Sequence, residues 1–550
     1  MPAVKWNSVW APCWVAGLSW FLTACSSGGS TPSNETVSSL FSFDAVDVPA
    51  LQTALQQQWA DSVWLQQQSP DTKALPLVYA QRGFKPFWLT KDGVHPCASR
   101  WLQALQSLRN DAMAVDSLEV HMLDSLLQEA GKKDVLENMV FLTTLETRFS
   151  QSYARTARRL IIGNGDSLGV PKKFWHPSND SANVPLWFAQ GAWSDSSSML
   201  QGFRPQHPWY IRLCNEYHRV DSLAKHMAIP QPSTWFSTDS NGVRTPTSSL
   251  YALLDARMQG IPDSFRATDS ATFKKLLARF QFQYGIKATG KLDSVTERLL
   301  QWPWEEQKKS LALNLERFRR FSNVYQQPFV WVNIPQMNLM VFANDTPVFY
   351  MRTVVGRPSR PTPVIDATMK HVVVSPPWTV PPTILEKDVL PGVLRRGGGY
   401  LARKGLKAVD GNGRPVNPSS ITLANYKRFS YTQKPGYNSS LGEVKFNMPN
   451  SESVYMHDTP HREDFPKANR ALSSGCVRVH KPKEFATFVL NDSVKYSYTK
   501  IDSMCKERKT KYIPVAKPMR VYFAYLTAGV DSTGRMMYPA DIYQWDPYRP

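Results

Sequence analysis

The sequence predicts an α+β protein of several domains: a mostly helical scaffold, a small three-helix module, and a β-rich domain with an inserted lid subdomain. Three observations lead to this class. Apolar residues recur at helical spacing through much of residues 45–264, short helical segments follow at 265–305, and β-branched and aromatic runs begin after Tyr325. A chain of 550 residues has room for about two to four domains.

The first 24 residues are predicted to be a signal peptide. Lys5 is their only charged residue, and an apolar stretch runs from Trp6 to Ala24. The ending Leu22-Thr23-Ala24-Cys25 resembles a bacterial lipobox, which implies cleavage before Cys25 and lipidation of that cysteine. An uncleaved anchor and a plain signal peptide are the alternatives. Residues 25–44, rich in Ser, Gly and Thr at their start, are expected to be a flexible tether.

Helical periodicity defines the next three segments. In the scaffold, residues 45–264, apolar residues repeat at helical spacing at Leu118, Met122, Leu126 and Leu127, and again at Leu142, Leu145, Phe149 and Tyr153. In the module, residues 265–305, Ser294-Val295-Thr296-Glu297 reads as a capping box that opens a helix. Residues 306–324 are expected to form one helix that returns to the scaffold.

Residues 325–545 are predicted to form the β-rich domain. Runs such as Phe329–Asn333 and Asn338–Phe342 flank turn residues, as strands of a sheet do. A long Pro- and Gly-rich stretch interrupts them, and a loop this long inside a domain is typically functional. We expect a lid at about residues 378–440, with disorder as the alternative.

Charge and composition restrict the class of partner. The hydrophobic fraction of 42% is ordinary for a globular protein, and the net charge is +19. Lys and Arg are spread along the chain, which fits a solvated basic surface or attraction to an anionic polymer or membrane face. Export and the lack of a recognisable nucleic-acid motif argue against a nucleic-acid partner.

Six cysteines occur, and one has the surroundings of a nucleophile. Cys13 would leave with the signal peptide, and Cys97, Cys214 and Cys505 are widely spaced, so any disulfide pairing among them is not readable. No metal site is expected. His457 and His461 have the i, i+4 spacing of a helical metal pair, but Thr459-Pro460 between them argues against a helix, and no third ligand is placed.

Cys476 follows Gly475 in a predicted turn, and His457 lies 19 residues upstream. A thiol needs a base to become a nucleophile, and backbone N–H groups at a turn, such as those of Gly475 and Cys476, can hold an oxyanion. The side chain of Asp458, or a nearby backbone carbonyl, is expected to fix the imidazole tautomer. On a strand, Arg478 would share a face with Cys476, where its charge would either bind a substrate carboxylate or keep the thiolate charged.

These residues lie in strings that resemble a known family. His457 followed by Ser-x-Gly-Cys-x-Arg resembles the YkuD-type L,D-transpeptidase signature, and the wider chain is similar to the large YcbB-like subfamily. The strings that carry this resemblance are Val374–Pro381, Lys387–Pro391, Gln433–Asn438, Leu441–Asn450, Tyr455–Pro460 and Arg470–Val479. Typical YkuD domains have His where this chain has Ser474, which would leave His457 as the only catalytic imidazole. Residues 265–305 resemble a peptidoglycan-binding module.

The resemblance implies a reaction. Cys476 would attack a peptidoglycan stem tetrapeptide, release D-Ala and pass the acyl group to an amine on a second stem, giving a 3→3 crosslink. Tyr455, Ser474 and Arg478 would line the donor site, and Trp378 and Tyr400 would belong to the lid. It also implies inhibition by carbapenem-type β-lactams and no cofactor. The lipobox is a difference from family members held by an uncleaved helix, and it implies a place in the cell envelope facing the periplasm, anchored by lipid to a membrane, with the outer membrane favoured.

Other functions remain open at this point. Water as acceptor would make the protein an L,D-carboxypeptidase. A free D-amino acid or a lysine of an envelope protein are further acceptors, and a non-catalytic lipoprotein that tethers membrane to wall is a different class. Neither the acceptor, the third residue of the stem nor the oligomeric state is readable.

Overall fold

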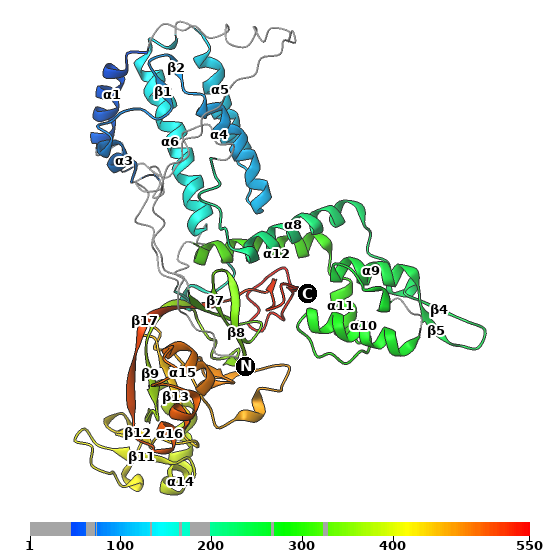
Figure 1. Ribbon diagram of the computed structural model, residues 1–550, viewed down its shortest axis with the longest axis vertical. Coiled ribbons are helices and arrows are strands. Elements are labelled where there is room, and N and C mark those ends of the chain that lie inside the picture. Colours follow the sequence, from blue (N-terminus) through cyan, green and yellow to red (C-terminus); the bar gives the residue numbers. More distant parts are fainter. Residues whose placement is uncertain are drawn as a thin grey trace, which may run out of the picture.

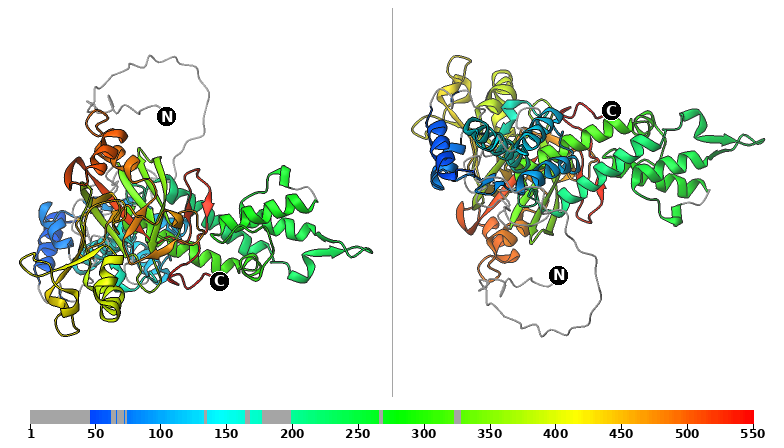
Figure 2. Two further views of the ribbon diagram at one scale, coloured as in Figure 1. Left: turned by 90° about the horizontal axis from the view of Figure 1, so that it is seen from below. Right: turned by 90° about the horizontal axis from the view of Figure 1, so that it is seen from above.

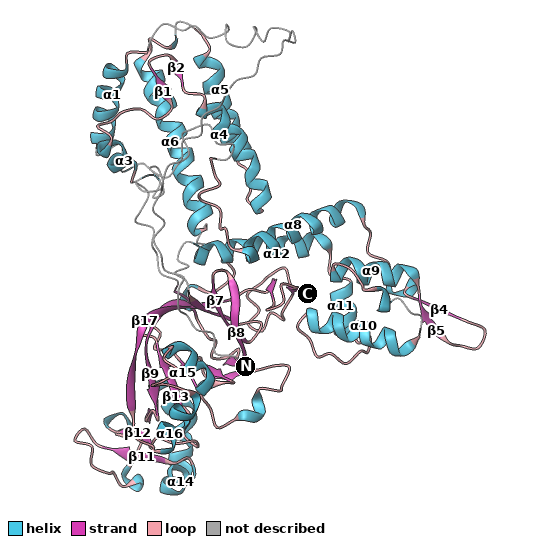
Figure 3. Cartoon of the chain, in the orientation of Figure 1, coloured by secondary structure: helices cyan, strands magenta, loops and turns pink. Residues whose placement is uncertain are grey.

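The computed structural model describes residues 46–61, 66, 72, 74–132, 135–163, 168–176, 199–265, 269–322 and 328–550. The expected signal peptide, Cys25 and the tether therefore lie outside the described residues. The chain forms three parts, which are a helical domain, a central helix pair with a side module, and a sheet domain (Figures 1 and 3). This confirms the predicted α+β multidomain class.

The first domain packs its helices around the longest one. Four residues predicted to form its apolar face, Leu142, Leu145, Phe149 and Tyr153, are all buried in that helix, α6, and rings of Trp88 and Trp101 pack against it. Asn138 caps its start by accepting N–H bonds from Val140 and Phe141. The elements are α1 (Val48–Ala60), α3 (Leu75–Gln81), β1 (Leu89–Thr90), β2 (Gly93–Val94), α4 (Cys97–Gln106), η2 (Ser107–Asp111), α5 (Ser117–Ala130) and α6 (Met139–Ile162).

The predicted apolar face of α5 is less buried than its spacing suggests. Leu118 is 81% exposed, and the fully buried leucine of this helix is Leu123. The helix lies at the outer side of the domain, so only part of its apolar stripe meets the core.

Two long helices, α8 (Pro208–His226) and α12 (Trp304–Ser322), run side by side below this domain (Figure 1). The side module contains α9 (Ser248–Met258), α10 (Ser270–Gln283) and α11 (Ser294–Leu300), and Figure 2 shows it projecting from the body with the hairpin of β4 (Phe236–Thr238) and β5 (Arg244–Pro246). The N-cap of α11 is Asp293, whose carboxylate accepts the Thr296 N–H, so the helix start lies one residue earlier than the predicted capping box.

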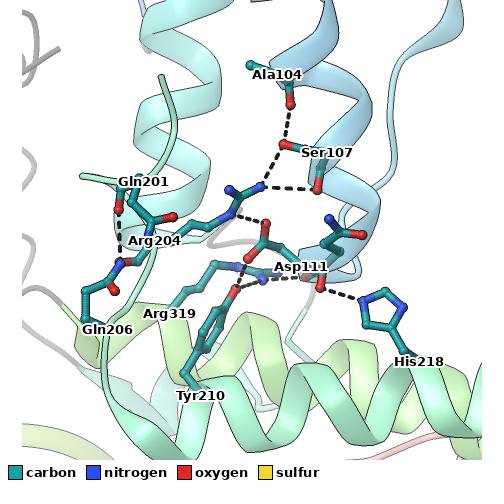
Figure 4. A network of polar contacts seen from close by, with 10 residues as sticks. Ala104, Ser107, Asp111, Gln201, Arg204, Gln206, Tyr210, His218 and Arg319 are labelled. Atoms are coloured by element: carbon teal, nitrogen blue, oxygen red, sulfur yellow. Dashed lines mark hydrogen bonds and ion pairs between the residues drawn. The ribbon is translucent and has the colours of Figure 1, made fainter. Parts of the chain in front are cut away.

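Arginines of α12 join the three parts of the molecule. The buried Arg317 donates to the carbonyl oxygens of Leu168 and Tyr525, and Arg319 donates to that of Asp111. Figure 4 shows the second joint, where the Asp111 carboxylate also accepts bonds from Arg204 and Tyr210. Because these buried polar groups are hydrogen-bonded to partners in other parts of the chain, they fix how the helical domain sits on α12.

The sheet domain is built on one large mixed sheet. Its strands run in the order β13-β14-β16-β8-β7-β6-β17-β9-β3, and a further pairing of β13 with β9 closes the path on itself. The strands are β3 (Trp175–His176), β6 (Phe329–Asn333), β7 (Asn338–Ala343), β8 (Thr346–Gly356), β9 (Val364–Val374), β13 (Val444–Asn447), β14 (Met456–His457), β15 (Ala471–Ser473), β16 (Val477–Val479) and β17 (Lys511–Ala524). Helices α15 (Pro482–Leu490) and α16 (Tyr498–Lys506) follow β16, and the hairpin of β18 (Gly529–Val530) and β19 (Met536–Met537) lies near the C-terminus.

The predicted lid, residues 378–440, is a folded subdomain with its own apolar core. Leu385, Val393, Leu401 and Tyr431 are among the buried residues of that core, which is separate from the core of the large sheet. Gly397 breaks the helix α14 with a φ of 50°, a conformation that glycine adopts easily. The elements are β10 (Trp378–Thr379), α13 (Pro382–Ile384), the π-helical turn η7 (Leu385–Val389), α14 (Leu390–Arg403), β11 (Leu406–Val409) and β12 (Ser430–Gln433).

No helix in the described ranges is both long enough and apolar enough to cross a membrane.

Candidate active site

His457 and Cys476 come together because their segments are neighbours in the large sheet. Strand β14 pairs in parallel with β16, so that Met456 lies beside Val477 and His457 beside Arg478. Met456 and Val477 point into the buried core. Since side chains alternate along a strand, Tyr455 and His457 share the other face with Cys476 and Arg478.

That face forms the wall of a cavity of about 740 Å³. Residues from the Cys476 loop, from β14 and from the lid surround it. Those named by the sequence prediction are Tyr455, His457, Ser474, Gly475, Cys476, Arg478 and Trp378. A cavity of this size holds a peptide segment rather than a single small ion.

A backbone carbonyl sets the tautomer of His457. Its Nδ1 lies 2.5 Å from the carbonyl oxygen of Asp458, so Nδ1 carries the proton and Nε2 is left as the base. The Asp458 carboxylate is occupied elsewhere: it accepts the N–H groups of Glu443 and Thr459 and pairs with Arg462. Of the two groups expected to orient the imidazole, the carbonyl rather than the side chain contacts the ring.

The thiol and the imidazole are both uncharged at rest. Burial, together with the positive charges of Arg478 and Lys445, lowers the pKa of His457 to about 3. Burial raises the pKa of the Cys476 thiol, although a backbone hydrogen bond from Tyr455 and the Lys445 charge act in the opposite direction. The pair at neutral pH is therefore thiol and neutral imidazole, and the thiol proton must move as the nucleophile attacks.

The turn that presents Cys476 is held by short polar contacts. Gly475 has a φ of +117°, which glycine tolerates, and its carbonyl oxygen accepts the Thr362 hydroxyl at 2.7 Å. The Gly475 N–H donates to the Ser473 hydroxyl oxygen at 3.2 Å. This N–H is thus engaged, which corrects its expected role as an oxyanion donor. For the Cys476 N–H, no acceptor occurs among the described residues.

Of the remaining predicted residues, Tyr455 and Arg478 line the cavity and Tyr400 does not. Tyr455 lies beside the thiol, with the Lys445 ammonium 3.9 Å from its ring centroid, and Arg478 pairs with Asp464 at 3.1 Å. Tyr400 does not line the cavity: its hydroxyl donates to the Asp388 carbonyl oxygen at 2.8 Å inside the lid, so its expected contact with substrate is not supported.

The other described cysteines lack this setting. Cys97, Cys214 and Cys505 are free thiols, and burial raises the pKa of each to about 12. No disulfide joins the four described cysteines. Cys476 is the one of the four that lines the cavity with an imidazole beside it. No cluster of metal-ligating side chains occurs in the described ranges.

Sequence reasoning missed two arginines and a lysine. Arg357 and Arg360 follow β8 and donate to the Ser474 hydroxyl oxygen at 2.8 and 3.1 Å. Lys445 lies on β13 directly opposite His457. Lys445 stands in one of the strings that carry the family resemblance, and that position was the available signal for it.

Comparisons with known proteins agree with this geometry. Residues 327–508 match the YkuD family model of the L,D-transpeptidase catalytic domain, and residues 73–216 match a scaffold domain model. The chain is 33% identical over 240 residues to a Haemophilus influenzae protein whose name places it among the L,D-transpeptidases; the match covers 43% of this chain and 48% of that protein. The chain thus spans about half the length of this relative.

Two solved structures show weaker likeness. L,D-transpeptidase 3 from Mycobacterium tuberculosis is 14% identical, with 35% of this chain and 60% of that chain covered and a TM-score of 0.18. The Ldtfm–avibactam carbamoyl enzyme is 9% identical, with coverage of 57% and 100% and a TM-score of 0.19. Both TM-scores are low, so these two structures establish no likeness in overall arrangement.

Proposed function

We propose that residues 327–508, which match the model of the YkuD-type L,D-transpeptidase catalytic domain, form such a domain, and that this chain forms 3→3 crosslinks between peptidoglycan stem peptides. The observation that carries the proposal is the Cys476–His457 pair at the wall of a peptide-sized cavity. Thiol acyl transfer needs a nucleophile, a base and room for a peptide, and these are present together.

In the first half of the reaction, the Cys476 sulfur attacks the carbonyl that precedes the terminal D-Ala of a tetrapeptide stem. His457 Nε2 takes the thiol proton as the carbon–sulfur bond forms. The imidazolium then protonates the leaving amine, the carbon–nitrogen bond breaks, and D-Ala departs. The acyl group is left on Cys476 as a thioester.

In the second half, an amine of another stem attacks the thioester and gives its proton to His457. The amide bond forms and the Cys476 thiol is regenerated. His457 is neutral at rest and its Nδ1 is bonded to the Asp458 carbonyl oxygen, so Nε2 is the nitrogen that accepts a proton in both halves. Charge that develops on the carbonyl oxygen would be met by the Cys476 N–H.

Intact-mass analysis with a purified tetrapeptide stem tests the proposal. We expect release of D-Ala, a transient acyl adduct on the protein, and dimers joined through the third residues. Cys476→Ala should abolish all three, whereas Cys505→Ala, which changes a buried thiol that does not line the cavity, should retain them. Full activity of Cys476→Ala would contradict the proposal. Tripeptide products without dimers would instead identify an L,D-carboxypeptidase.

A carbapenem serves as an independent probe of the same thiol. We propose that it acylates Cys476, since a strained β-lactam carbonyl presents the same electrophile as the stem peptide. The expected result is one adduct mass per chain, absent in Cys476→Ala. An adduct that persists in Cys476→Ala would show that another group reacts.

We also propose that the protein is held at an envelope membrane, facing the periplasm, through lipid on Cys25. The support is the sequence Leu22-Thr23-Ala24-Cys25 after an apolar stretch. Mass analysis of the mature N-terminus should show a lipidated Cys25, and Cys25→Ala should release the protein from membranes. An N-terminus that still carries residues 1–24 would contradict this.

A further inference from the structure

An excess of positive charge surrounds the nucleophile loop. Arg357 and Arg360 bond to Ser474, and Arg478 interacts electrostatically with Cys476 and Arg357. Arg360 pairs with Asp388, and Arg478 pairs with Asp464. Arg357 has no carboxylate partner among the described residues, and its buried Nε has no hydrogen-bond acceptor there.

The Ser474 hydroxyl is hydrogen-bonded to two of these guanidiniums. Its hydroxyl oxygen accepts one bond from Arg357 at 2.8 Å and one from Arg360 at 3.1 Å. The backbone N–H of Arg357 also donates to the Ser473 carbonyl oxygen at 3.0 Å, because β8 ends beside β15. Both guanidiniums are therefore anchored to the loop that carries Cys476, two residues further on.

A carboxylate of the lid, that of Asp388, is bonded to the Arg360 guanidinium. Asp388, in the turn η7, accepts a second bond from Arg360 at 2.9 Å, and hydrogen bonding and charge from Arg360 and the charge of Arg357 lower the pKa of its carboxyl. Asp388, Arg360 and Ser474 line the same cavity as Cys476. The Asp388 carboxylate is thus bonded to Arg360 and influenced by the charge of Arg357 at the cavity wall.

We propose that Arg357 and Arg360, joined through Ser474, form the subsite that binds the terminal carboxylate of the acyl donor, and that Asp388 of the lid occupies this subsite when no donor is bound. The inference rests on the proposed function. Arg357 has no carboxylate of its own among the described residues, so a donor carboxylate that takes the place of Asp388 can bond to both guanidiniums. Displacement of Asp388 would then link donor binding to the position of the lid.

Chain geometry agrees with this location. In a peptide that ends in D-Ala, the carboxylate carbon lies within about 4 Å of the scissile carbonyl carbon, since three bonds separate them. A donor whose carbonyl lies at Cys476 must therefore place its carboxylate close to the nucleophile loop. Arginine pairs well with a carboxylate there because its planar guanidinium offers parallel N–H donors.

Binding measurements on the full chain with Cys476→Ala test the subsite without turnover. The probes are a tetrapeptide stem that ends in D-Ala and the same peptide with a terminal amide. We expect Arg357→Gln to weaken binding of the carboxylate peptide by about 10-fold and to change binding of the amide by less than about 2-fold. Asp388→Asn, which removes the competing carboxylate charge, should tighten binding of the carboxylate peptide by about 3-fold or more.

Glu386→Gln is the matched control, because Glu386 lies in the same turn but bonds to Tyr426 and Lys427 within the lid. It should leave both affinities unchanged. Equal affinity for carboxylate and amide peptides, or weaker carboxylate binding in Asp388→Asn, would overturn the subsite while leaving the proposed function intact. Binding of neither peptide would overturn the donor class itself, and the subsite with it.

Discussion

Lys445→Met is expected to raise the pKa of both Cys476 and His457. Lys445 lies opposite His457 in the β13–β14 pair, and its positive charge lowers the pKa of both groups. The Cβ atoms of residues directly opposite one another on neighbouring strands lie about 4.5–5.5 Å apart. Two unit charges about 6 Å apart at an effective dielectric of about 20 interact by about 3 kcal/mol, or about two pKa units.

Lys445 is only half-buried, so solvent screening reduces the expected shift to about one unit. The sign follows from the charge: a cation stabilises the thiolate and opposes the imidazolium, so its removal raises the pKa of each group. At a pH below the thiol pKa, a rise of one unit lowers the thiolate fraction, and with it the alkylation rate, by about 10-fold.

The assay is the rate of Cys476 alkylation by iodoacetamide, an uncharged reagent, followed by intact mass from pH 6 to pH 10. Cys476→Ala supplies the background from other thiols. Lys445→Arg keeps the charge and should retain the profile of the unmodified chain. A Lys445→Met profile that superimposes on that of the unmodified chain, or equal profiles for Met and Arg, would refute the electrostatic role of this residue.

Three further predictions concern the frame around the site. Gly442→Ala adds a Cβ 2.4 Å from the Asp458 carboxylate at a φ of +59°. It should lower D-Ala release by about 10-fold or more, because it displaces the residue whose carbonyl orients His457. Gly413→Ala, with a φ of +76° and open space around it, is the control, and equal losses of activity in the two variants would contradict this reason. Asp111→Ala removes the buried partner of Arg204 and should lower the free energy of unfolding by about 3 kcal/mol in denaturant titrations. Glu129→Ala, which removes an exposed ion pair with Lys132, is the control and should cost under about 0.5 kcal/mol. Similar costs for the two variants would contradict a stabilising role of the buried contacts of Asp111. Burial raises the pKa of Glu146 to about 7 from 4.5, so its stabilising contribution is complete below pH 4.5 and is lost as pH rises through 7. The unfolding free energy relative to Glu146→Gln should therefore fall by about 3 kcal/mol between pH 4.5 and pH 8. A free-energy difference that does not change with pH would disprove the raised pKa.

Local chemistry was readable from the residues. The sequence shows a Gly-Cys turn and an upstream His, and the alternation of side chains along a strand predicts that Cys476 and Arg478 lie on one face. The parallel pairing of β14 with β16 places His457 beside Arg478 on that face. Short β-branched runs after Tyr325 predicted the starts of β6 and β7, because such residues favour a pleated, buried surface. These inferences succeed because they depend on neighbours in sequence.

Contacts between distant segments were not readable. Tyr400 was expected at the substrate, but the lid core turns it toward the Asp388 carbonyl. Arg357 reaches Ser474 across 117 positions of sequence, because β8 and β15 end side by side. Nothing in the local pattern of either segment indicates this register, which follows from the closure of the whole sheet.

By itself the sequence determined the reactive pair, the helical and β-rich regions, and the existence of an insertion between Trp378 and the Cys476 loop. Only the tertiary structure decided that a backbone carbonyl holds His457, that the thiol and imidazole are neutral, and that the lid carboxylate of Asp388 sits on Arg360. The reason is physical: residue type and spacing specify what a group can do, whereas burial and the charges packed around it set the protonation state and partners that it has.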